Sequence, residues 1–197
     1  MRIYGRDKKM KAETTKGEHM TSLSGGRLVS KTHGRIAFRG VIDTLQAEVI
    51  EAQVLASELG KKADSTGGGE SLVCGCLGEI LEYLRNIIAA EVKETPLPPP
   101  FLFGMDAEEI HRRSHNAGGK TFLLPAYTQG TLAARINTLR AKLREAELLA
   151  VRVFGPGEDP QREDIILALN RLSSALWWLF CEYVSGNPAS TTTVTPE

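Results

Sequence analysis

The chain of 197 residues carries no net charge, because 24 lysine and arginine residues balance 24 acidic residues. General nucleic-acid binding depends on a basic surface, so this balance disfavours a nucleic-acid-binding protein. The sequence also lacks any run of about 18 consecutive apolar residues, and we therefore expect no membrane span. Its N-terminal stretch has no apolar segment of the kind that a secretory signal requires.

Cysteine is scarce, with only Cys74, Cys76 and Cys181. Three cysteines do not make a disulfide framework, so we expect a reducing, cytoplasmic location. Cys74 and Cys76 form a CxC pair, but no second Cys or His cluster stands at zinc-site spacing. We interpret the pair as small, partly buried helix residues and predict no bound metal.

The two ends of the chain lack apolar periodicity. Residues 1–20 are polar and basic, and residues 187–197 are of low complexity, so we expect both segments to be mobile around one domain over residues 21–186. Residues 61–70 contain three consecutive glycines and are typical of a flexible loop. Residues 96–100 contain four prolines and predict a stiff extended connector.

Between these breaks, apolar residues recur at helical spacing. The pattern predicts four long helices, over residues 36–59, 72–92, 132–153 and 164–184. A short helix is expected over residues 106–115, with Asp106 near its start. No convincing alternating strand is found. The fold class predicted is all-α, an antiparallel helix bundle of four long helices and one short helix.

Several polar residues of the long helices are candidates for a site. Arg140, Arg144 and Glu147 share one helix face, which is typical either of a solvated salt-bridged surface or of a binding site. Asp43 lies in an apolar run and is expected to be partly buried, so it needs a partner, and Arg140 is a natural one. That pair can also be a simple salt bridge between helices. Asn170 in the apolar last helix needs hydrogen bonds from a ligand or from a neighbouring helix.

Three further features remain ambiguous from the sequence. Residues 21–35, rich in Ser, Thr, Gly and basic residues, precede a helix and can hold phosphate oxygens, although they do not form a Walker P-loop. His111 and His115 have metal-ligand spacing, but a di-iron bundle needs a second such motif, so we expect them to hydrogen-bond locally or to line a pocket. Trp177 and Trp178 face different ways, one predicted in the core and the other at an interface.

Three segments in order, VSKTHGRIAFRGVIDTLQAEV, LRAKLREAELLAVRVF and DIILALNRLSSAL, resemble the ATP:corrinoid adenosyltransferases. The resemblance runs over residues 20–184 and is greatest for the ethanolamine-utilisation branch, which also has GMDAEEIHRRSH and a later Leu-Pro pair. It implies a ferritin-like bundle, often a homotrimer with ATP near subunit interfaces. The implied reaction transfers the 5′-deoxyadenosyl group of ATP to the cobalt of cob(I)alamin, giving adenosylcobalamin and triphosphate.

The resemblance also implies roles for single residues. It assigns Asp43 and Arg140 to a paired strut and Arg144 to the catalytic site. ATP contacts fall at Thr21, Ser22, Lys31, Arg35, Arg144, Glu147 and Asn170. Phe122 falls where the more distant propanediol-utilisation branch places an aromatic residue against the lower face of the corrin.

Cofactors and partners follow from the same resemblance. The implied ligands are ATP with Mg²⁺, and cobalamin as substrate. The implied assembly is a homo-oligomer, with a trimer favoured. The implied partners are a flavin reductant and ethanolamine ammonia-lyase within a bacterial microcompartment. The chain departs from the propanediol-utilisation branch at Thr44, Glu145 and Ser174, and it lacks the N-terminal His/Cys cluster of some ethanolamine-branch members, so we expect no structural iron or zinc. Two alternatives stay open, a non-catalytic carrier of cobalamin or ATP and a helical-bundle interaction protein.

Overall fold

The computed structural model describes residues 17–62, 68–117, 123–158 and 160–186. These residues form five α-helices, one 3-10 turn and two short strands, so the all-α prediction is confirmed. Of the two predicted mobile ends, residues 1–16 and 187–197 lie outside the described residues, whereas residues 17–20 are described and Met20 begins the first strand. In chain order the elements are β1 (Met20–Ser22), β2 (Leu28–Ser30), α1 (Gly34–Lys62), α2 (Gly68–Lys93), α3 (Ala107–Asn116), η1 (Tyr127–Gln129), α4 (Gly130–Phe154) and α5 (Glu163–Gly186).

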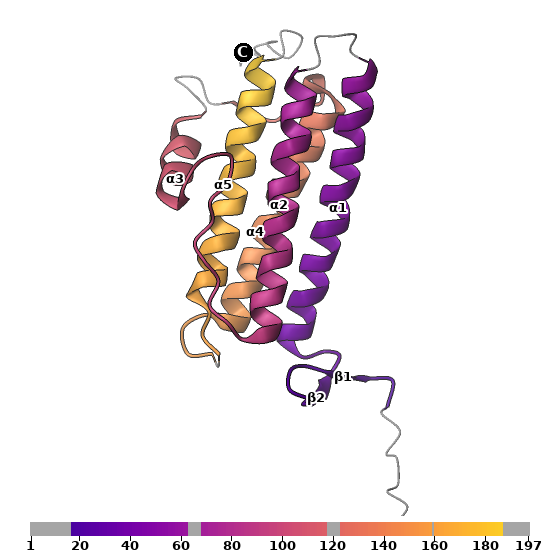
Figure 1. Ribbon diagram of the computed structural model, residues 1–197, viewed down its shortest axis with the longest axis vertical. Helices are drawn as coiled ribbons and strands as arrows, with labels where there is room; N and C mark the ends of the chain where they lie inside the picture. The colour runs from indigo at the N-terminus through magenta and orange to yellow at the C-terminus, as the bar shows by residue number, and fades with distance from the viewer. Residues whose placement is uncertain (1–16, 63–67, 118–122, 159, 187–197) are drawn as a thin grey trace, which may run out of the picture.

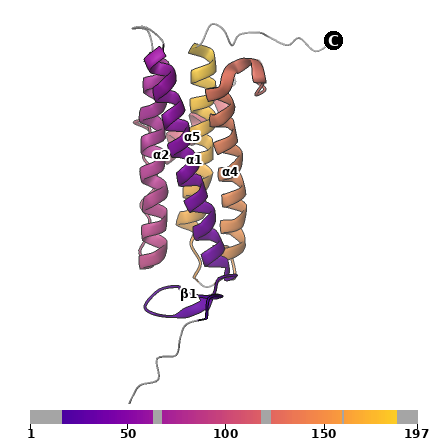
Figure 2. The ribbon, with the colours of Figure 1, turned by 90° about the vertical axis from the view of Figure 1, so that its right-hand side faces the viewer.

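The four long helices lie side by side as an antiparallel bundle (Figures 1 and 2). Each helix buries a stripe of apolar residues three or four positions apart, which in α1 runs through Phe38, Ile42, Leu45 and Val49. Helix α4 packs mainly on α5, and α1 packs mainly on α2. Burial of these stripes supplies most of the stability, at roughly 25 cal/mol per Å² of apolar surface.

Helix α5 is the central helix of the core, with eleven buried residues between Ile165 and Val184. Of the described helices, it alone is long and apolar enough to meet the length and composition criteria for a membrane span. More than half of its most apolar window, 56%, is buried against the other helices, as the core helix of a bundle requires.

The chain between α2 and α3 returns along the outside of the bundle, and α3 then packs against α5 (Figure 1). Residues 95–100 are neither helical nor paired as strands, as the prolines predicted. Asp164 at the start of α5 accepts a 2.8 Å hydrogen bond from the backbone N–H of Leu97. At its far end the connector packs Phe103 against Trp178, with ring centroids 5.8 Å apart. Asp106 then caps α3 by accepting a 2.8 Å bond from the N–H of Glu109.

The prediction that no strand occurs was wrong at the N-terminal end. Strands β1 and β2 pair antiparallel, with Thr21 opposite Val29. Gly25 and Gly26 have φ values of +53° and +80° in the turn, which side chains with a Cβ rarely adopt. Each strand has only three residues, too few to give an alternating pattern. Leu23, only 2% exposed, anchors this hairpin at the end of the bundle where α1 begins.

Candidate functional site

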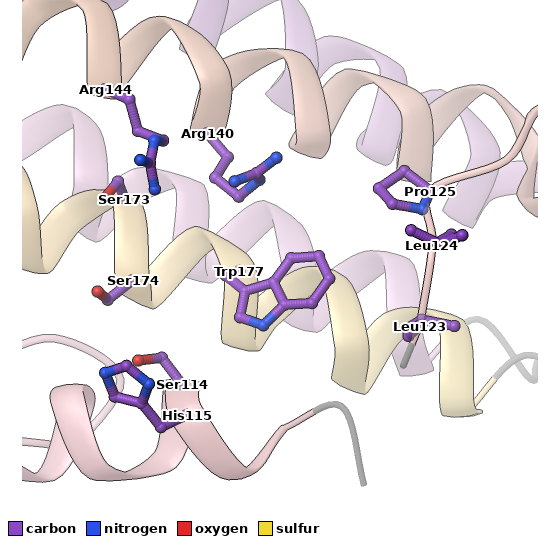
Figure 3. Close-up of a pocket in the computed structure, with 10 residues that line it drawn as sticks. All are labelled: Ser114, His115, Leu123, Leu124, Pro125, Arg140, Arg144, Ser173, Ser174 and Trp177. Carbon is purple, nitrogen blue, oxygen red and sulfur yellow. The ribbon is translucent and has the colours of Figure 1, made fainter. Parts of the chain in front are cut away.

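A pocket of about 470 Å³ opens between α3, α4 and α5 (Figure 3). Helix α4 contributes two arginines, α5 contributes two serines and a tryptophan, and α3 closes the opposite side. The loop before η1 adds an apolar wall. The lining residues are Ser114, His115, Leu123, Leu124, Pro125, Arg140, Arg144, Ser173, Ser174 and Trp177. The pocket therefore combines a cationic side with an aromatic and aliphatic side.

The Arg140 guanidinium lies over the indole ring of Trp177, 5.4 Å from its centroid. Its Nε also donates a 3.0 Å hydrogen bond to Oδ1 of Asn137. Trp177 in turn stacks on Phe180, with ring planes 16° apart and centroids 5.4 Å apart. Burial, with the like charge of Arg144, lowers the pKa of Arg140 below its usual value. The aromatic stack thus fixes a partly desolvated cation at the pocket wall.

Arg144 lies one turn further along α4, and its side chain points toward Ser173 in the same pocket (Figure 3). Neither Arg140 nor Arg144 has a carboxylate partner among the ion pairs of the described residues. Two neighbouring guanidinium groups without an acid repel each other, and an anionic ligand relieves that repulsion through charge-assisted hydrogen bonds. The charge of the pocket therefore suits a phosphate-bearing molecule.

Glu147 and Asn170 connect α4 to α5 beside this pocket. The amide of Asn170 donates a 2.9 Å hydrogen bond to Oε1 of Glu147. Ser173 Oγ donates a 2.8 Å bond to the backbone carbonyl of Asn170. Asn170 thus bonds a neighbouring helix, one of the two possibilities that the sequence left open.

Asp43 does not occupy the predicted position. It is exposed on α1, and no ion pair among the described residues includes it. The reason is helical geometry, because Asp43 follows the fully buried Ile42 and is rotated by about 100° from it. The expected burial of Asp43, and its pairing with Arg140 inside one chain, were therefore wrong.

The hairpin that contains Thr21 and Ser22, with Lys31 directly after it, lies at the end of the bundle away from α3, the helix that closes one side of the pocket (Figure 1). Gly34 packs against Val153 near the C-terminal end of α4. Arg144 is ten residues before Phe154, the last residue of α4, which corresponds to about 15 Å along the helix axis. The structure thus brings Arg140, Arg144, Glu147 and Asn170 together but leaves the hairpin at the end of the bundle.

Arg35 is also placed differently from the prediction that it contacts ATP. It is only 4% exposed, and its Nε donates a 2.5 Å hydrogen bond to Oε1 of the fully buried Glu91. Its Nη1 donates to Glu94 and its Nη2 to the carbonyl of Glu91. These contacts join α1 to α2, and we therefore leave Arg35 out of the nucleotide site.

The last predicted residues to be placed are Phe122 and the two histidines of α3. Phe122 lies outside the described residues, but the following Leu123 and Leu124 line the pocket. His115 also lines it and packs edge-on against His111, with ring centroids 4.4 Å apart, so the expectation of a pocket-lining histidine is confirmed. In the described part of the chain, no group of three or more His, Cys, Asp or Glu residues is arranged to hold a metal.

Sequence reasoning missed Trp177 as a pocket residue. It was assigned to the core or to an interface, yet it is half-buried and lines the pocket beside Ser173 and Ser174. A usable signal was present, because Trp177 follows Asn170 by seven residues and Ser173 by four, which places all three on one helix face.

The chain matches the family model described as cobalamin adenosyltransferase over residues 12–183. It is 30% identical over 177 residues to the corrinoid adenosyltransferase EutT of Salmonella typhimurium, and 31% identical over 177 residues to EutT of Escherichia coli K12. Each match covers 88% of this chain but 61% of the relative, so the chain spans about three fifths of the length of these curated relatives.

The bundle is also similar to two solved structures of variants of the PduO-type ATP:corrinoid adenosyltransferase from Lactobacillus reuteri, both complexed with cobalamin and ATP. The TM-score is 0.59 and the sequence identity 17% for each. The first comparison covers 85% of this chain and 89% of the other. At this identity the likeness establishes the shared fold.

Proposed function

The chain belongs to the cobalamin adenosyltransferase family, and we propose that it transfers the 5′-deoxyadenosyl group of ATP to reduced cobalamin. The products are adenosylcobalamin and triphosphate. The observation that carries this proposal is the pocket in which Arg140 and Arg144, which have no carboxylate partner among the described residues, face an apolar wall that includes Trp177 and Leu123. A polyanion and a large flat macrocycle are the two ligands that such a pocket suits.

In this reaction the Co(I) of the substrate attacks the 5′-carbon of the ribose. A cobalt–carbon bond forms, the carbon–oxygen bond to the phosphate breaks, and the triphosphate leaves with the bonding electron pair. Co(I) is a strong nucleophile, so the protein need not supply a general base. It must hold the two substrates in line, exclude water and stabilise the charge that develops on the leaving group.

These requirements assign a role to each group of residues in the pocket. Arg144, with Arg140 behind it, stabilises the departing phosphate oxygens, while Glu147 and Asn170 bind the nucleoside end of ATP. Trp177 and the loop residues 122–124, Phe122 among them, cover the lower face of the corrin and keep water from the cobalt. Mg²⁺ would accompany ATP, because its preferred ligands in nucleotide sites are phosphate oxygens.

We further propose that the site is completed in a homo-oligomer, with a trimer favoured by the family resemblance. In that arrangement the hairpin of one subunit, with Thr21, Ser22 and Lys31, holds the triphosphate of ATP bound at the pocket of its neighbour. Exposed Asp43 of one subunit then pairs with Arg140 of the next. Exposed apolar side chains on α1 and α4, the helices that carry Asp43 and Arg140, support a contact between subunits. They are Ile50 and Val54 of α1 and Leu148 and Val151 of α4.

The wider setting is proposed from the ethanolamine branch of the family. A flavin reductant supplies the electron that forms Co(I), and adenosylcobalamin passes to ethanolamine ammonia-lyase. We place the protein in the cytoplasm, in association with a bacterial microcompartment. Its three cysteines are free thiols, which is consistent with a reducing compartment.

An anaerobic assay tests the proposed reaction. The full chain is mixed with ATP, Mg²⁺, cobalamin and a strong chemical reductant, and the loss of Co(I) absorbance is followed. We expect a light-sensitive alkylcobalamin product, and we expect Arg144→Ala to reduce its formation at least a hundredfold, as loss of a transition-state cation does. Arg85→Ala, which removes an exposed arginine from α2, is the matched control and leaves turnover unchanged.

Two other results would contradict the proposal. ATP binding without any alkylcobalamin product favours a carrier of ATP or cobalamin. A melting temperature that does not rise with ATP or with cobalamin favours a helical-bundle interaction protein.

A further inference from the structure

Glu94 directly follows α2 and has a φ of +55°, in the left-handed region that favours glycine. The N–H of Thr95 donates a 3.0 Å hydrogen bond to the carbonyl of Ala90, which closes the last turn of the helix. Glycine is the usual residue at the left-handed position of such a turn. A glutamate here carries a conformational cost, so its side chain must supply a compensating interaction.

The Glu94 carboxylate supplies two such interactions. Its Oε1 accepts a 2.8 Å hydrogen bond from Nη1 of Arg35, in the first turn of α1, and a 3.0 Å bond from Oγ of Ser24, in the turn of the β1–β2 hairpin. Arg35 is itself fixed by the buried Glu91. One carboxylate at the end of α2 therefore joins the turn of the hairpin and the first turn of α1 to each other.

Charge strengthens this connection. A cavity of about 270 Å³ beneath the hairpin is lined by Arg27, Arg35, Glu94, Pro160 and Arg162. Glu94 is the one acidic residue among those five. Hydrogen bonds from Arg35 and Ser24, with the charge of Arg27 further away, lower the pKa of Glu94, so the carboxylate stays ionised near neutral pH. Arg35 and Arg162 also pair with Glu91 and Asp164, so loss of Glu94 would chiefly remove the attraction that draws Arg27, and with it the hairpin, toward the end of α2.

We propose that Glu94 is a positioning residue, which holds the β1–β2 hairpin in the orientation that binds the triphosphate of ATP. This inference rests on the proposed function, because that function assigns Thr21, Ser22 and Lys31 to the triphosphate. Glu94 does not contact the nucleotide. It acts through Ser24 and Arg35 on residues that do.

If Glu94 served only to end α2, replacing it with glycine would leave both the hairpin and the binding of ATP unchanged. Glycine suits a φ of +55° better than glutamate, so Glu94→Gly keeps the backbone and removes only the carboxylate. Glu94→Gln keeps the side-chain length and removes the charge. The matched control is Glu82→Gln, which neutralises an exposed glutamate of α2 that makes no hydrogen bond or ion pair among the described residues.

The first measurement is limited digestion with trypsin, read as the rate of cleavage after Arg27, which is exposed in the hairpin turn. Mass spectrometry identifies the fragment. Local opening of the hairpin controls this rate. We expect cleavage after Arg27 to be at least fivefold faster in both Glu94 variants than in wild type and in Glu82→Gln, while the melting temperature of Glu94→Gly stays within about 3 °C of wild type.

The second measurement concerns the substrate. We expect KM for ATP to rise roughly tenfold in both Glu94 variants, with KM for cobalamin and kcat at saturating ATP nearly unchanged, because the lost interaction positions only the phosphate ligands. Binding of inorganic tripolyphosphate, measured by calorimetry, should weaken by a similar factor. A KM for ATP equal to that of wild type, or unchanged cleavage after Arg27, would overturn the role of Glu94.

The tripolyphosphate measurement separates this inference from the proposed function. A wild-type protein that binds tripolyphosphate but forms no alkylcobalamin removes the proposed transferase activity, and weaker binding by Glu94→Gly then still supports the positioning role. A wild-type protein that does not bind tripolyphosphate overturns the positioning role, whatever its turnover.

Discussion

The amide of Asn170 on α5 donates a 2.9 Å hydrogen bond to Oε1 of Glu147 on α4. This contact joins the two helices that carry most of the pocket, and Arg144 lies one turn before Glu147 on the same face of α4. The hydrogen bond therefore sets the spacing of the helices at the site. It also orients a carboxylate and an amide at the edge of the pocket, where both can bind a nucleoside.

We predict that Asn170→Ala weakens both the helix contact and the use of ATP. Loss of a hydrogen bond to a charged group should lower the free energy of unfolding by about 1–2 kcal/mol. KM for ATP should rise about tenfold, while KM for cobalamin changes little. Chemical denaturation and steady-state kinetics measure the two effects. A variant with lower stability and an unchanged KM for ATP would show that Asn170 serves only the packing of α4 on α5.

The indole of Trp177 should influence the site through Arg140. Trp177→Leu removes the ring over which the guanidinium lies, a contact worth about 0.5–1 kcal/mol at a partly exposed site. We expect two- to fivefold weaker binding of ATP, measured by calorimetry, because Arg140 is assigned to the phosphate oxygens. Trp177→Phe retains an aromatic face and should bind nearly as wild type does. Equal binding by the leucine and phenylalanine variants would exclude a role for the aromatic ring.

The sequence predicted the helices well because their signal is local. Apolar residues at positions such as Phe38, Ile42 and Leu45 recur within one helix, and periodicity alone locates the buried face. The spacing of these buried residues already excludes Asp43, whose side chain faces outward although Val41, Ile42 and Leu45 lie close to it in the sequence. Counting apolar neighbours was misleading where the angular position on the helix was informative.

The sequence identified some residues of the candidate site. The contacts that it did not predict join segments that are far apart in the chain. Arg144, Glu147 and Asn170 were identified from the resemblance, and the structure brings them together. The bond between Arg35 and Glu91 joins residues 56 positions apart, and no local pattern specifies which acid a helical arginine will meet. The hairpin was missed for a different reason, since three-residue strands give no alternation.

The buried carboxylate of Glu91 should be important for stability. It accepts 2.5 Å hydrogen bonds from both Arg35 and Arg39 and is fully buried. Glu91→Ala removes the buried acid from two arginines, of which Arg35 keeps only the half-exposed Glu94, and this costs about 3–5 kcal/mol. For a chain of this size the melting temperature should fall by roughly 10 °C. Glu82→Gln on the same helix is the control, and an equal, small effect of both substitutions would contradict the buried network.

The cysteines should differ in reactivity. Burial, with smaller contributions from Glu79 and Glu182 respectively, raises the pKa values of Cys76 and Cys181 to about 11. At pH 8 only about one in a thousand of these thiols is a thiolate, and thiolate is the form that reacts. Iodoacetamide should therefore alkylate the half-buried Cys74 first, with peptide mass spectrometry as the measurement. Alkylation of Cys181 in the native protein as fast as that of Cys74 would disagree with its burial.

Asp164 should make the stability of the bundle depend on pH. Burial acts to raise the pKa of its carboxyl group, but the bonds from Arg162 and from the N–H groups of Leu97 and Ile165 outweigh it, so the pKa is lowered from 3.8. A lowered acid pKa stabilises the folded state above the unfolded value, near pH 4, and that stabilisation is lost as the pH falls through the folded value. Asp164→Asn should therefore be less stable than wild type at pH 7 by about 1–2 kcal/mol. The difference between the two proteins should shrink steadily as unfolding is measured at lower pH. A difference that is the same at pH 7 and at pH 3 would mean that the ionised carboxylate does not hold the connector against α5.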